Sequence, residues 1–456
     1  MNAEIMPSIP TLSDSGKTLP GKVTLNANPR RNTEAKKLVT YLLELVSRSY
    51  VDPIDWDRLF TACERKLEER YGPASRGNNA STASDRKGKT ATTLIAEAVD
   101  RYVPDDSAPS RSANVAAACA QGVVALLDTH SAFIDQEEFQ DLQTGPRATA
   151  ALGVELQDRK TYFGVVRAFP GTPASQAGIR AGDRVVAVDG KPVAGATTLQ
   201  VTKLLRGSPG SRVVITLSRN EVEPAIDVVL TRQTITIQNI HHKQLDSGLL
   251  LLRIDAFNQD AVGAVANALQ EDFQAASPAA TGIILDLRDN AGGLLTSVVG
   301  VAAAFLGGDS IVARTKGRGR DSDMELRASP RYYVRGERGD PNANLPLQSK
   351  TLPMVVLVNG RTASGAEILA AALRDQGRAF VLGTPTFKLG TIQTILPLPM
   401  QSALKLTTSR VYRPNGRPIN EGVVPDVALK NQERTPDFAD ASDPYLAEAT
   451  RMLRPR

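Results

Sequence analysis

The sequence predicts a multidomain α+β protein, because the spacing of its apolar residues changes twice along the 456 residues. Between residues 33 and 127 they recur at helical spacing. Between residues 152 and 219 they form short runs separated by Gly, Pro and Asp, which is typical of strands and turns. From residue 235, apolar strands alternate with helices. We therefore expect an N-terminal helical region, an inserted β-rich unit, and an α/β core whose sheet is covered by helices.

The composition predicts mostly aliphatic cores and argues against one class of function. Hydrophobic residues make up 41% of the chain, but aromatic residues make up only 5%. The 54 basic residues barely outnumber the 49 acidic ones. No basic motif is interleaved with aromatic residues, so we expect no nucleic-acid binding. The basic run Thr315–Arg320 is expected to be a solvated loop.

The helical region is expected to span residues 33–147. Two helices are predicted between Thr33 and Tyr71, because the Asp-Pro of "VDPIDW" ends the first helix and Asp55 can cap the second. Residues 73–90 are poor in apolar side chains, which predicts a disordered insertion.

The β-rich unit is expected to span residues 148–220. One short helix, "TPASQAG", is predicted between two of its strands, and another at Thr198–Leu205. The predicted strands are "LGVEL", "YFGVVRAF", "DRVVAVDG" and "RVVITLSR".

The α/β core is expected to span residues 235–430, and residues 431–456 form a C-terminal tail. Helices are predicted from Asp260, Leu294 and Ala366. Each follows an uninterrupted apolar run, which is typical of strands buried on both faces. The runs are "GLLLLRIDAF", "GIILDLRD" and "PMVVLVNG".

Two stretches of the β-rich unit resemble a PDZ domain: "ALGV" at Ala151–Val154 and "GTPASQAGIRAGDRVVAVDGKPV" at Gly171–Val193. In such a domain an extended peptide adds a strand to a sheet edge, and its terminal carboxylate rests on consecutive backbone N–H groups. Gly153 would let the backbone approach closely. The alternative is a small sandwich without a ligand. The resemblance assigns peptide binding to Ala151, Leu152, Gly153 and Val154.

Ser364 stands between an apolar strand and an alanine-rich helix, in "NGRTASGAEILAAALRD". A serine at such a junction can present its hydroxyl at the positive end of the helix, and the N–H of Gly365 can stabilise an oxyanion. Serine is also the ordinary residue that caps a helix N-terminus. The local spacing alone therefore leaves a nucleophile and a simple cap as alternatives.

Three stretches together resemble the carboxy-terminal processing, or tail-specific, proteases: "LDLRDNAGGLL", "RTASGAEI" and "SRVYRPNGRPINEGVVPDV". The upstream stretches "YVDPIDWDRLF" and "ALLDTHSAFIDQEEFQDL" are similar to the helical segments of that family. Its members are serine endopeptidases with a Ser-Lys dyad and an embedded PDZ domain. The resemblance implies a protein or peptide substrate with a free, apolar C-terminus, and it implies no metal and no cofactor.

The family pattern assigns roles to individual residues of this chain. Ser364 takes the place of the nucleophile. Gln393 falls on a glutamine that orients the catalytic base. The oxyanion hole is assigned to Gly365 together with Gly292 or Gly293.

The sequence departs from the family pattern at the base. The family reads Thr-(Phe/Tyr)-Gly-Lys-Gly-x-(Ile/Val)-Gln, and this chain has "TFKLGTIQ" at Thr386–Gln393. Leu389 therefore stands where the lysine is expected, and Lys388 stands one residue earlier, at a glycine position. A second departure is Ala366, where the family has a serine.

The main prediction is a serine endopeptidase with Ser364 as nucleophile and Lys388 as base, because the scaffold, the nucleophile and the oxyanion glycines all remain, but the offset leaves an alternative open. In an extended segment neighbouring side chains point to opposite faces, so Leu389 would fill the pocket and Lys388 would face away. The chain would then be a weakened or inactive pseudoprotease that binds protein C-termini as an adaptor. A turn or bulge could instead aim the long stem of Lys388 at Ser364 and complete the dyad.

The remaining reactive side chains are given structural roles. His130, His241 and His242 are expected to be structural, and no Cys/His ligand cluster predicts a zinc site. Cys63 and Cys119 lie in helical contexts, where one disulfide and two buried free thiols are both open.

The N-terminal residues 1–32 are polar and are expected to be loose. They do not read as a signal peptide, and no run of 18 apolar residues predicts a membrane span. The family resemblance implies export to the periplasm or a similar space. Without an export signal in this chain, a cytoplasmic location is also open.

Overall fold

The computed structural model describes 13 segments, and its secondary structure agrees with the predicted order of parts. The described chain forms two compact units: residues 137–238, and the segments before and after them. The predicted loose segment 1–32 and nearly all of the predicted insertion 73–90 lie outside the described residues. The described segments are 33–73, 90–103, 109–143, 151–159, 161–169, 171–196, 198–219, 222–234, 238–275, 279–319, 322–334, 339–430 and 435–454.

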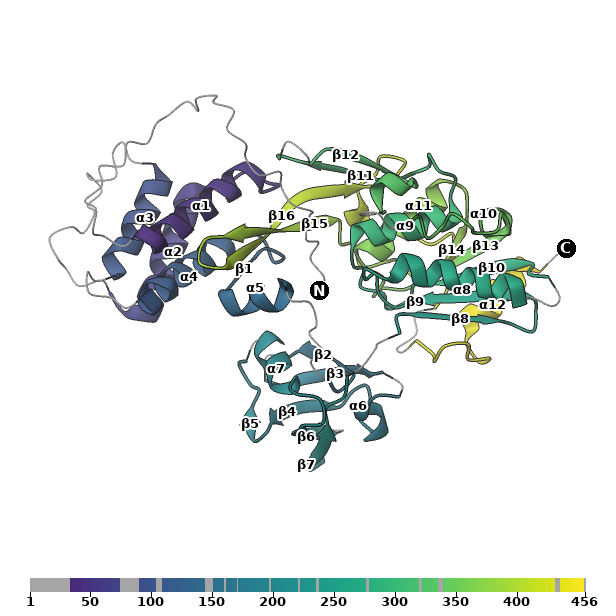
Figure 1. Ribbon diagram of the computed structural model, residues 1–456, viewed down its shortest axis with the longest axis horizontal. Coiled ribbons are helices and arrows are strands. Elements are labelled where there is room, and N and C mark those ends of the chain that lie inside the picture. The colour runs from purple at the N-terminus through teal and green to yellow at the C-terminus, as the bar shows by residue number, and fades with distance from the viewer. Residues whose placement is uncertain are drawn as a thin grey trace. The chain divides into compact units, whose positions relative to one another are not determined.

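Four helices form the N-terminal region (Figure 1): α1 (Thr33–Ser49), α2 (Trp56–Tyr71), α3 (Ala91–Tyr102) and α4 (Pro109–Val124). The predicted break between α1 and α2 is confirmed, because the Asp55 side chain caps α2 by accepting a hydrogen bond from the Arg58 N–H. Cys63 and Cys119 form a disulfide that joins α2 to α4. The bridge, rather than two free thiols, is therefore what the structure contains.

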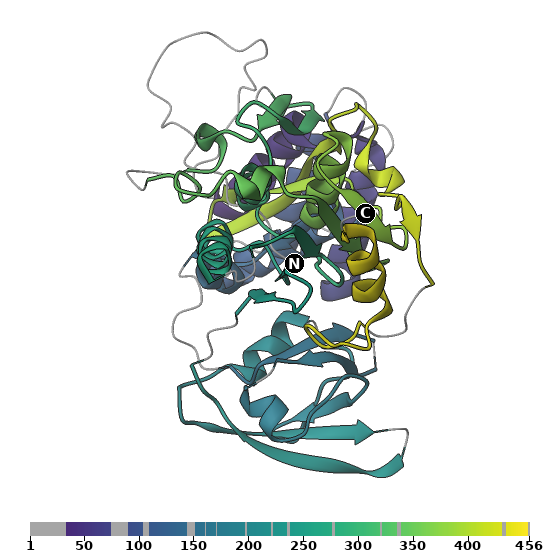
Figure 2. The same ribbon diagram turned by 90° about the vertical axis from the view of Figure 1, so that its right-hand side faces the viewer.

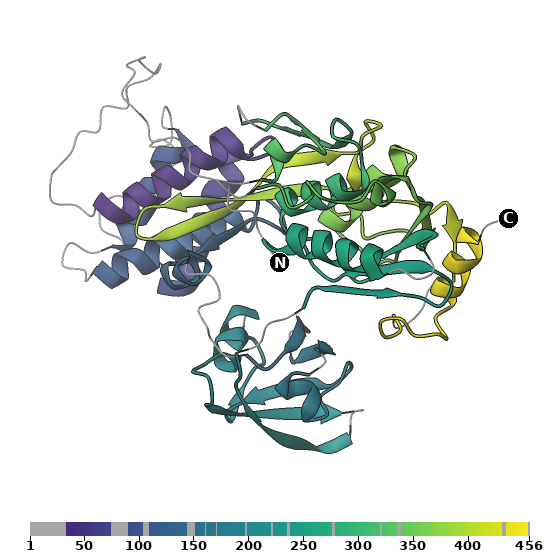
Figure 3. The same cartoon turned by 45° about the vertical axis from the view of Figure 1, so that its right-hand side comes forward.

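A long β-hairpin connects the core to these helices (Figure 1 and Figure 3). It consists of β15 (Thr391–Leu398) and β16 (Ser402–Tyr412), and β1 (Ala132–Ile134) pairs with β16. Three leucines near the hairpin tip belong to the hydrophobic core of the helical region: Leu398, Leu404 and Leu406. The other end of the hairpin pairs with β11 (Ile311–Gly317), which pairs in turn with β12 (Met324–Arg327).

The central sheet of the core has the order β17-β14-β13-β10-β9-β8. Its strands are parallel except for β8, which pairs antiparallel with β9. Alternate strand residues belong to two different hydrophobic clusters, so the sheet is buried on both faces, as predicted. The strands are β8 (Ile240–Gln244), β9 (Leu249–Ile254), β10 (Gly282–Asp286), β13 (Met354–Val358), β14 (Phe380–Gly383) and β17 (Val427–Ala428).

The helices α8 (Ala261–Ala275), α9 (Leu295–Phe305) and α11 (Gly365–Asp375) contribute to one of these clusters, and the short helix α10 (Gln348–Thr351) lies beside α9. The helix α12 (Pro444–Leu453) contributes to the other, and Figure 2 shows it in yellow at the C-terminal end of the core. The segment predicted only as a tail therefore covers a face of the sheet.

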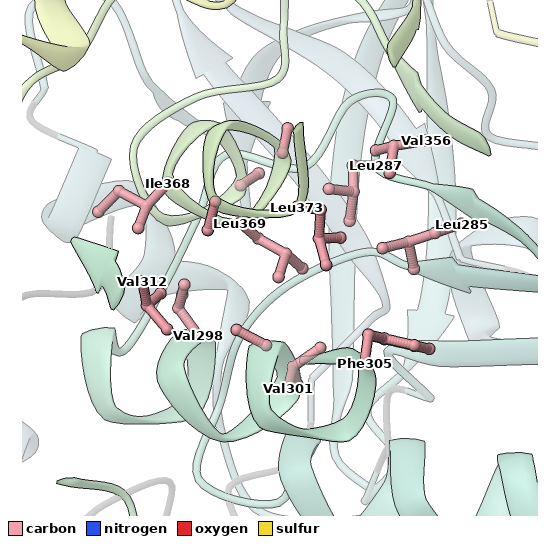
Figure 4. Packing of buried hydrophobic residues seen from close by; sticks show 14 of the residues in the cluster. Leu285, Leu287, Val298, Val301, Phe305, Val312, Val356, Ile368, Leu369 and Leu373 are labelled. Atoms are coloured by element: carbon pink, nitrogen blue, oxygen red, sulfur yellow. The ribbon is translucent and has the colours of Figure 1, made fainter. Parts of the chain in front are cut away.

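Packing between α9 and α11 fixes the position of α11 (Figure 4). Val298 and Val301 of α9 face Ile368 and Leu369 of α11, and all four side chains are buried. Full burial of one such side chain stabilises the fold by roughly 1.5–3 kcal/mol. The N-terminus of α11 is consequently held at one place above the sheet, and this helix begins directly after Ser364.

The inserted unit is a sheet of order β2-β3-β4-β6-β7 with β5 paired to β4. The four strands predicted from the sequence are present. The unit is longer than the predicted residues 148–220, because β7 pairs with β6 as far as Thr231. The elements are α5 (Gln136–Gln143), which leads into it, β2 (Val154–Asp158), β3 (Phe163–Ala168), α6 (Pro173–Gln176), β4 (Arg184–Val188), β5 (Lys191–Pro192), α7 (Thr198–Leu205), β6 (Arg212–Arg219) and β7 (Val222–Thr231).

Candidate active site

Ser364 occupies a sharp turn between β13 and α11. Its backbone has φ 52° and ψ −118°, a region that residues other than glycine seldom adopt. Such a conformation costs about 1–3 kcal/mol and persists only where the surrounding structure imposes it, most often at functional sites. The half-buried serine is therefore held in a strained turn at the N-terminus of a buried helix, which an ordinary helix cap would not require.

Glu367 holds this turn against the segment that carries Lys388 and Leu389. The side chain is 0% exposed. Its Oε2 accepts from the N–H groups of Ser364 (2.9 Å) and Leu389 (2.9 Å). Its Oε1 accepts from the Lys388 N–H (2.8 Å) and the Thr386 hydroxyl (2.5 Å). Burial raises the pKa of Glu367, and the four hydrogen bonds act in the opposite direction.

The glycines of "DNAGG" lie against the Ser364 turn. A Cβ atom on Gly292 would approach the Gly365 nitrogen to 2.7 Å, so the close contact requires glycine. The Gly292 N–H already donates to Asn290 Oδ1 at 2.7 Å. In the described part of the chain, the N–H groups of Gly293 and Gly365 have no hydrogen-bond acceptor. The geometry thus favours Gly293 over Gly292 as the partner of Gly365 in an oxyanion hole.

Lys388 and Leu389 point in different directions. Lys388 has φ 74°, its side chain is exposed, and its stem lies over Gly422, where an added Cβ would meet Lys388 Cγ at 2.9 Å. Leu389 is half-buried and lines the cavity beside Ser364. The left-handed backbone at Lys388 is one that glycine adopts without strain. This fits the family pattern, in which a glycine precedes the lysine.

The cavity beside Ser364 has a volume of about 30 Å³, room for about two water molecules. No side chain that lines it, within the described residues, is ionisable. Its polar side chains are those of Ser364, Thr391 and Gln393, and the Gln393 amide donates to the Thr391 hydroxyl at 2.9 Å. The lining residues are Gly293, Leu295, Ser364, Gly365, Ile368, Leu389, Thr391, Ile392, Gln393 and Val411.

The structure therefore brings together most of the residues that the sequence selected. Ser364, Gly365, Gly293 and Gln393 meet around one cavity, whereas Lys388 lies outside its lining. The sequence analysis gave no role to Thr391. Its only signal is that it stands two residues before Gln393, on the same face of a strand.

The predicted peptide-binding loop of the inserted unit has the expected backbone features. Gly153 has φ 73°, and a Cβ atom there would lie 2.2 Å from the Cβ of Thr172. The N–H groups of Leu152 and Gly153 have no acceptor among the described residues. The loop leads into β2, which is the last strand at one edge of its sheet. A free strand edge beside unpaired N–H groups can receive an extended chain end.

The histidines make ordinary polar contacts. His241 Nε2 lies 3.3 Å from Asp255 Oδ2, and His242 Nδ1 lies 2.9 Å from Asp272 Oδ1. Among the described residues, no group of three or more His, Cys, Asp and Glu side chains is placed to hold a metal ion. Every helix in the described segments is too short or too polar to cross a lipid bilayer.

Known proteins match both parts of this architecture. Residues 248–429 match peptidase family S41, and residues 164–219 match the PDZ domain. The chain is 32% identical over 332 residues to a carboxy-terminal-processing protease of Bartonella bacilliformis, a match that covers 72% of each chain. It is 28% identical over 326 residues to the carboxy-terminal processing protease CtpA of Bacillus subtilis, covering 71% of this chain and 64% of the relative.

A solved structure is similar over nearly the whole length. The photosystem II D1 C-terminal processing protease superposes with a TM-score of 0.60 at 25% identity, covering 92% of this chain and 97% of the other. The fold and these matches thus define the class of protein as the serine-peptidase fold of family S41 with an inserted PDZ domain. More particularly, the chain belongs to the carboxy-terminal-processing proteases of peptidase family S41.

Proposed function

We propose that this protein captures the apolar C-terminal ends of other proteins in its PDZ domain and hydrolyses them only weakly or not at all. One observation carries the second half of the proposal: Leu389, rather than a lysine, lines the cavity beside Ser364, and no ionisable side chain lines that cavity in the described residues. Capture is supported by the unpaired N–H groups of Leu152 and Gly153 next to the free edge of β2.

Hydrolysis requires a group that takes the proton of the Ser364 hydroxyl as its oxygen attacks the substrate carbonyl. The N–H groups of Gly293 and Gly365, which are unpaired among the described residues, support a role for them in stabilising the negative charge that forms on the carbonyl oxygen. A neutral lysine amine would accept the proton and then give it to the leaving amine. Leucine can do neither, so the rate should be about four to six orders of magnitude below that of a working dyad.

A second candidate function is hydrolysis with Lys388 as the base. It is favoured by the exposed ammonium group on the residue next to Leu389, at the end of a flexible stem. To reach Ser364, Lys388 would have to leave its φ of 74°. The hydrogen bonds from the N–H groups of Lys388 and Leu389 to Glu367 oppose this change.

Variants at Ser364, Lys388 and Leu389 separate these functions. In Leu389→Lys, we expect cleavage of a fluorogenic peptide with an apolar C-terminus to rise by at least a hundredfold, since the new amine faces Ser364. The companion variant Lys388→Gly/Leu389→Lys restores the family order of glycine and lysine. Adding Ser364→Ala to either variant should abolish the gain. Binding of the same peptide to Ser364→Ala, measured by fluorescence anisotropy, tests capture without turnover.

The second candidate function predicts a different set of results. If Lys388 is the base, the unmodified protein cleaves the peptide efficiently, and Lys388→Ala removes that activity. Efficient cleavage that is lost in Lys388→Ala would overturn the proposal of a weak site. Equal affinity for the free and the amidated C-terminus would overturn the proposal of capture by the PDZ domain.

We further propose that the protein works in an oxidising compartment such as the periplasm. The disulfide between Cys63 and Cys119 supports this, because such bonds persist outside the reducing cytoplasm. Fractionation of the native host, with an antibody against the protein, tests the location. Recovery in the cytoplasmic fraction with both thiols reduced would refute it.

A further inference from the structure

Three exposed side chains lie on two neighbouring segments, one of which continues into the cavity lining at Leu389. Phe387 is 60% exposed and Val424 is 58% exposed, and the exposed Lys388 follows Phe387, with its stem over Gly422 of the second segment. The segments are joined because the Val423 N–H donates to the Thr386 hydroxyl at 2.8 Å. We call Phe387, Lys388 and Val424 the rim. Large apolar side chains exposed together at a functional site commonly mark a binding surface.

Lys388 is held on this surface by its backbone. The N–H groups of Lys388 and the following residue are both tied to Glu367, and the side chain stem lies over Gly422. In the described part of the chain the ammonium group has no hydrogen-bond or ion-pair partner. Glu421, which precedes Gly422 in the chain, is exposed and forms no ion pair with Lys388 among the described residues. The rim therefore presents one available positive charge next to two apolar side chains.

The conformation of Lys388 is also costly. A φ of 74° is strained for a residue with a side chain, and glycine adopts it without this strain. Strain of this kind at the edge of an active site is a reason to look for a role of the side chain itself.

We propose that the rim recognises an acidic residue flanked by apolar residues in the polypeptide that crosses Ser364. Lys388 would pair with the carboxylate, while Phe387 and Val424 contact the apolar neighbours. The inference rests on the proposed function, because it requires that a chain be brought to Ser364. An exposed ion pair contributes about 0.2–1 kcal/mol, so the expected effect is a preference of up to about fivefold.

The test measures binding to the full-length Ser364→Ala protein, in which no cleavage interferes. The probes are labelled 20-residue peptides that share their last six residues, so that the contribution of the PDZ domain is constant. Aspartate or asparagine is placed at one internal position after another, each next to leucine or valine. We expect at least one position at which the aspartate peptide binds about three- to fivefold more tightly than the asparagine peptide at low salt.

The variants assign this preference to the rim. Lys388→Gln should abolish it, Lys388→Arg should keep it, and 0.5 M salt should weaken it. Phe387→Ala should weaken the binding of the aspartate peptide and of the asparagine peptide to the same degree. Lys350→Gln is the matched control, because Lys350 is an exposed lysine on α10, and it should change nothing.

Two outcomes would overturn the inference. In the first, binding still requires a free C-terminus, but the protein does not prefer the aspartate peptides, or Lys388→Gln keeps the same preference. In that case the rim proposal falls and capture by the PDZ domain stands. The other is an absence of binding by any peptide, free or amidated, in which case both proposals fall together.

Discussion

At the scale of single residues, one buried carboxylate sets the geometry of the site. Glu367 receives hydrogen bonds from the turn that carries Ser364 and from the segment that carries Lys388 and Leu389. The side chain at position 389 therefore faces the nucleophile, whatever its chemistry. Lysine at this position would complete the proposed dyad, whereas the side chain of leucine has no group that could accept a proton.

The motifs predicted the nucleophile and the glycine pair, but not which glycine N–H is free. That choice depends on Asn290, whose side chain accepts from Gly292 and leaves Gly293 unpaired. The sequence pattern also left the direction of Lys388 open. It is decided by a positive φ and by hydrogen bonds to Glu367, and both depend on tertiary contacts.

Glu367→Gln should lower the free energy of unfolding by about 2–4 kcal/mol, because an amide cannot accept four hydrogen bonds in the same geometry and some donors stay buried without a partner. Urea titration followed by circular dichroism measures the change. Glu421→Gln is the control, since Glu421 is exposed, and it should cost less than about 0.5 kcal/mol. An equal effect of the two substitutions would contradict the role given to Glu367.

At the scale of elements, the helices could be predicted and several long-range strand pairs could not. The break before α2 and its Asp55 cap follow from local sequence. The pairing of β1 with β16 joins residues about 270 positions apart, for example Ala132 with Lys405. Apolar periodicity reports which face of a strand is buried, but it does not report which distant strand lies beside it.

The disulfide between α2 and α4 should stabilise the helical region by about 4 kcal/mol, the chain-entropy value for a separation of 56 residues. The double variant Cys63→Ala/Cys119→Ala should lose this amount. Trp56 is the only tryptophan in the chain and begins α2, so its fluorescence during urea titration reports on this region. A reductant should shift the unmodified protein toward the variant and leave the variant unchanged. No shift in either measurement would show that the bond does not stabilise this region.

At the scale of the whole molecule, the order of the parts could be predicted, but the limits of the inserted unit could not. The sequence placed its end near residue 220, yet β7 continues the sheet to Thr231. The local sequence pattern near residue 220 looks like a boundary, but β7 pairs with β6 and belongs to the same sheet. The helix α12 was likewise not predicted within the C-terminal tail, because it is stabilised by its contacts with the core.

Residues 137–238 have a hydrophobic core of their own, so we expect them to fold when expressed alone. This fragment should bind a peptide with a free apolar C-terminus at least about tenfold more tightly than its amide, because the amide loses a charged hydrogen-bond acceptor. Thermal melting by circular dichroism checks folding, and isothermal titration calorimetry checks binding. If the fragment folds but binds both peptides with equal affinity, the proposed binding of free C-termini by the PDZ domain is wrong.

The carboxylate of Glu367 has a wider consequence, because it binds both the Ser364 turn and the segment that carries Lys388 and Leu389. Neither of these two segments can move without breaking hydrogen bonds to this carboxylate. Side chains on these two segments can therefore be substituted while the backbone keeps its position. A substitution at position 389 would thus change the chemistry beside Ser364 and leave the backbone on both sides of the cavity in place.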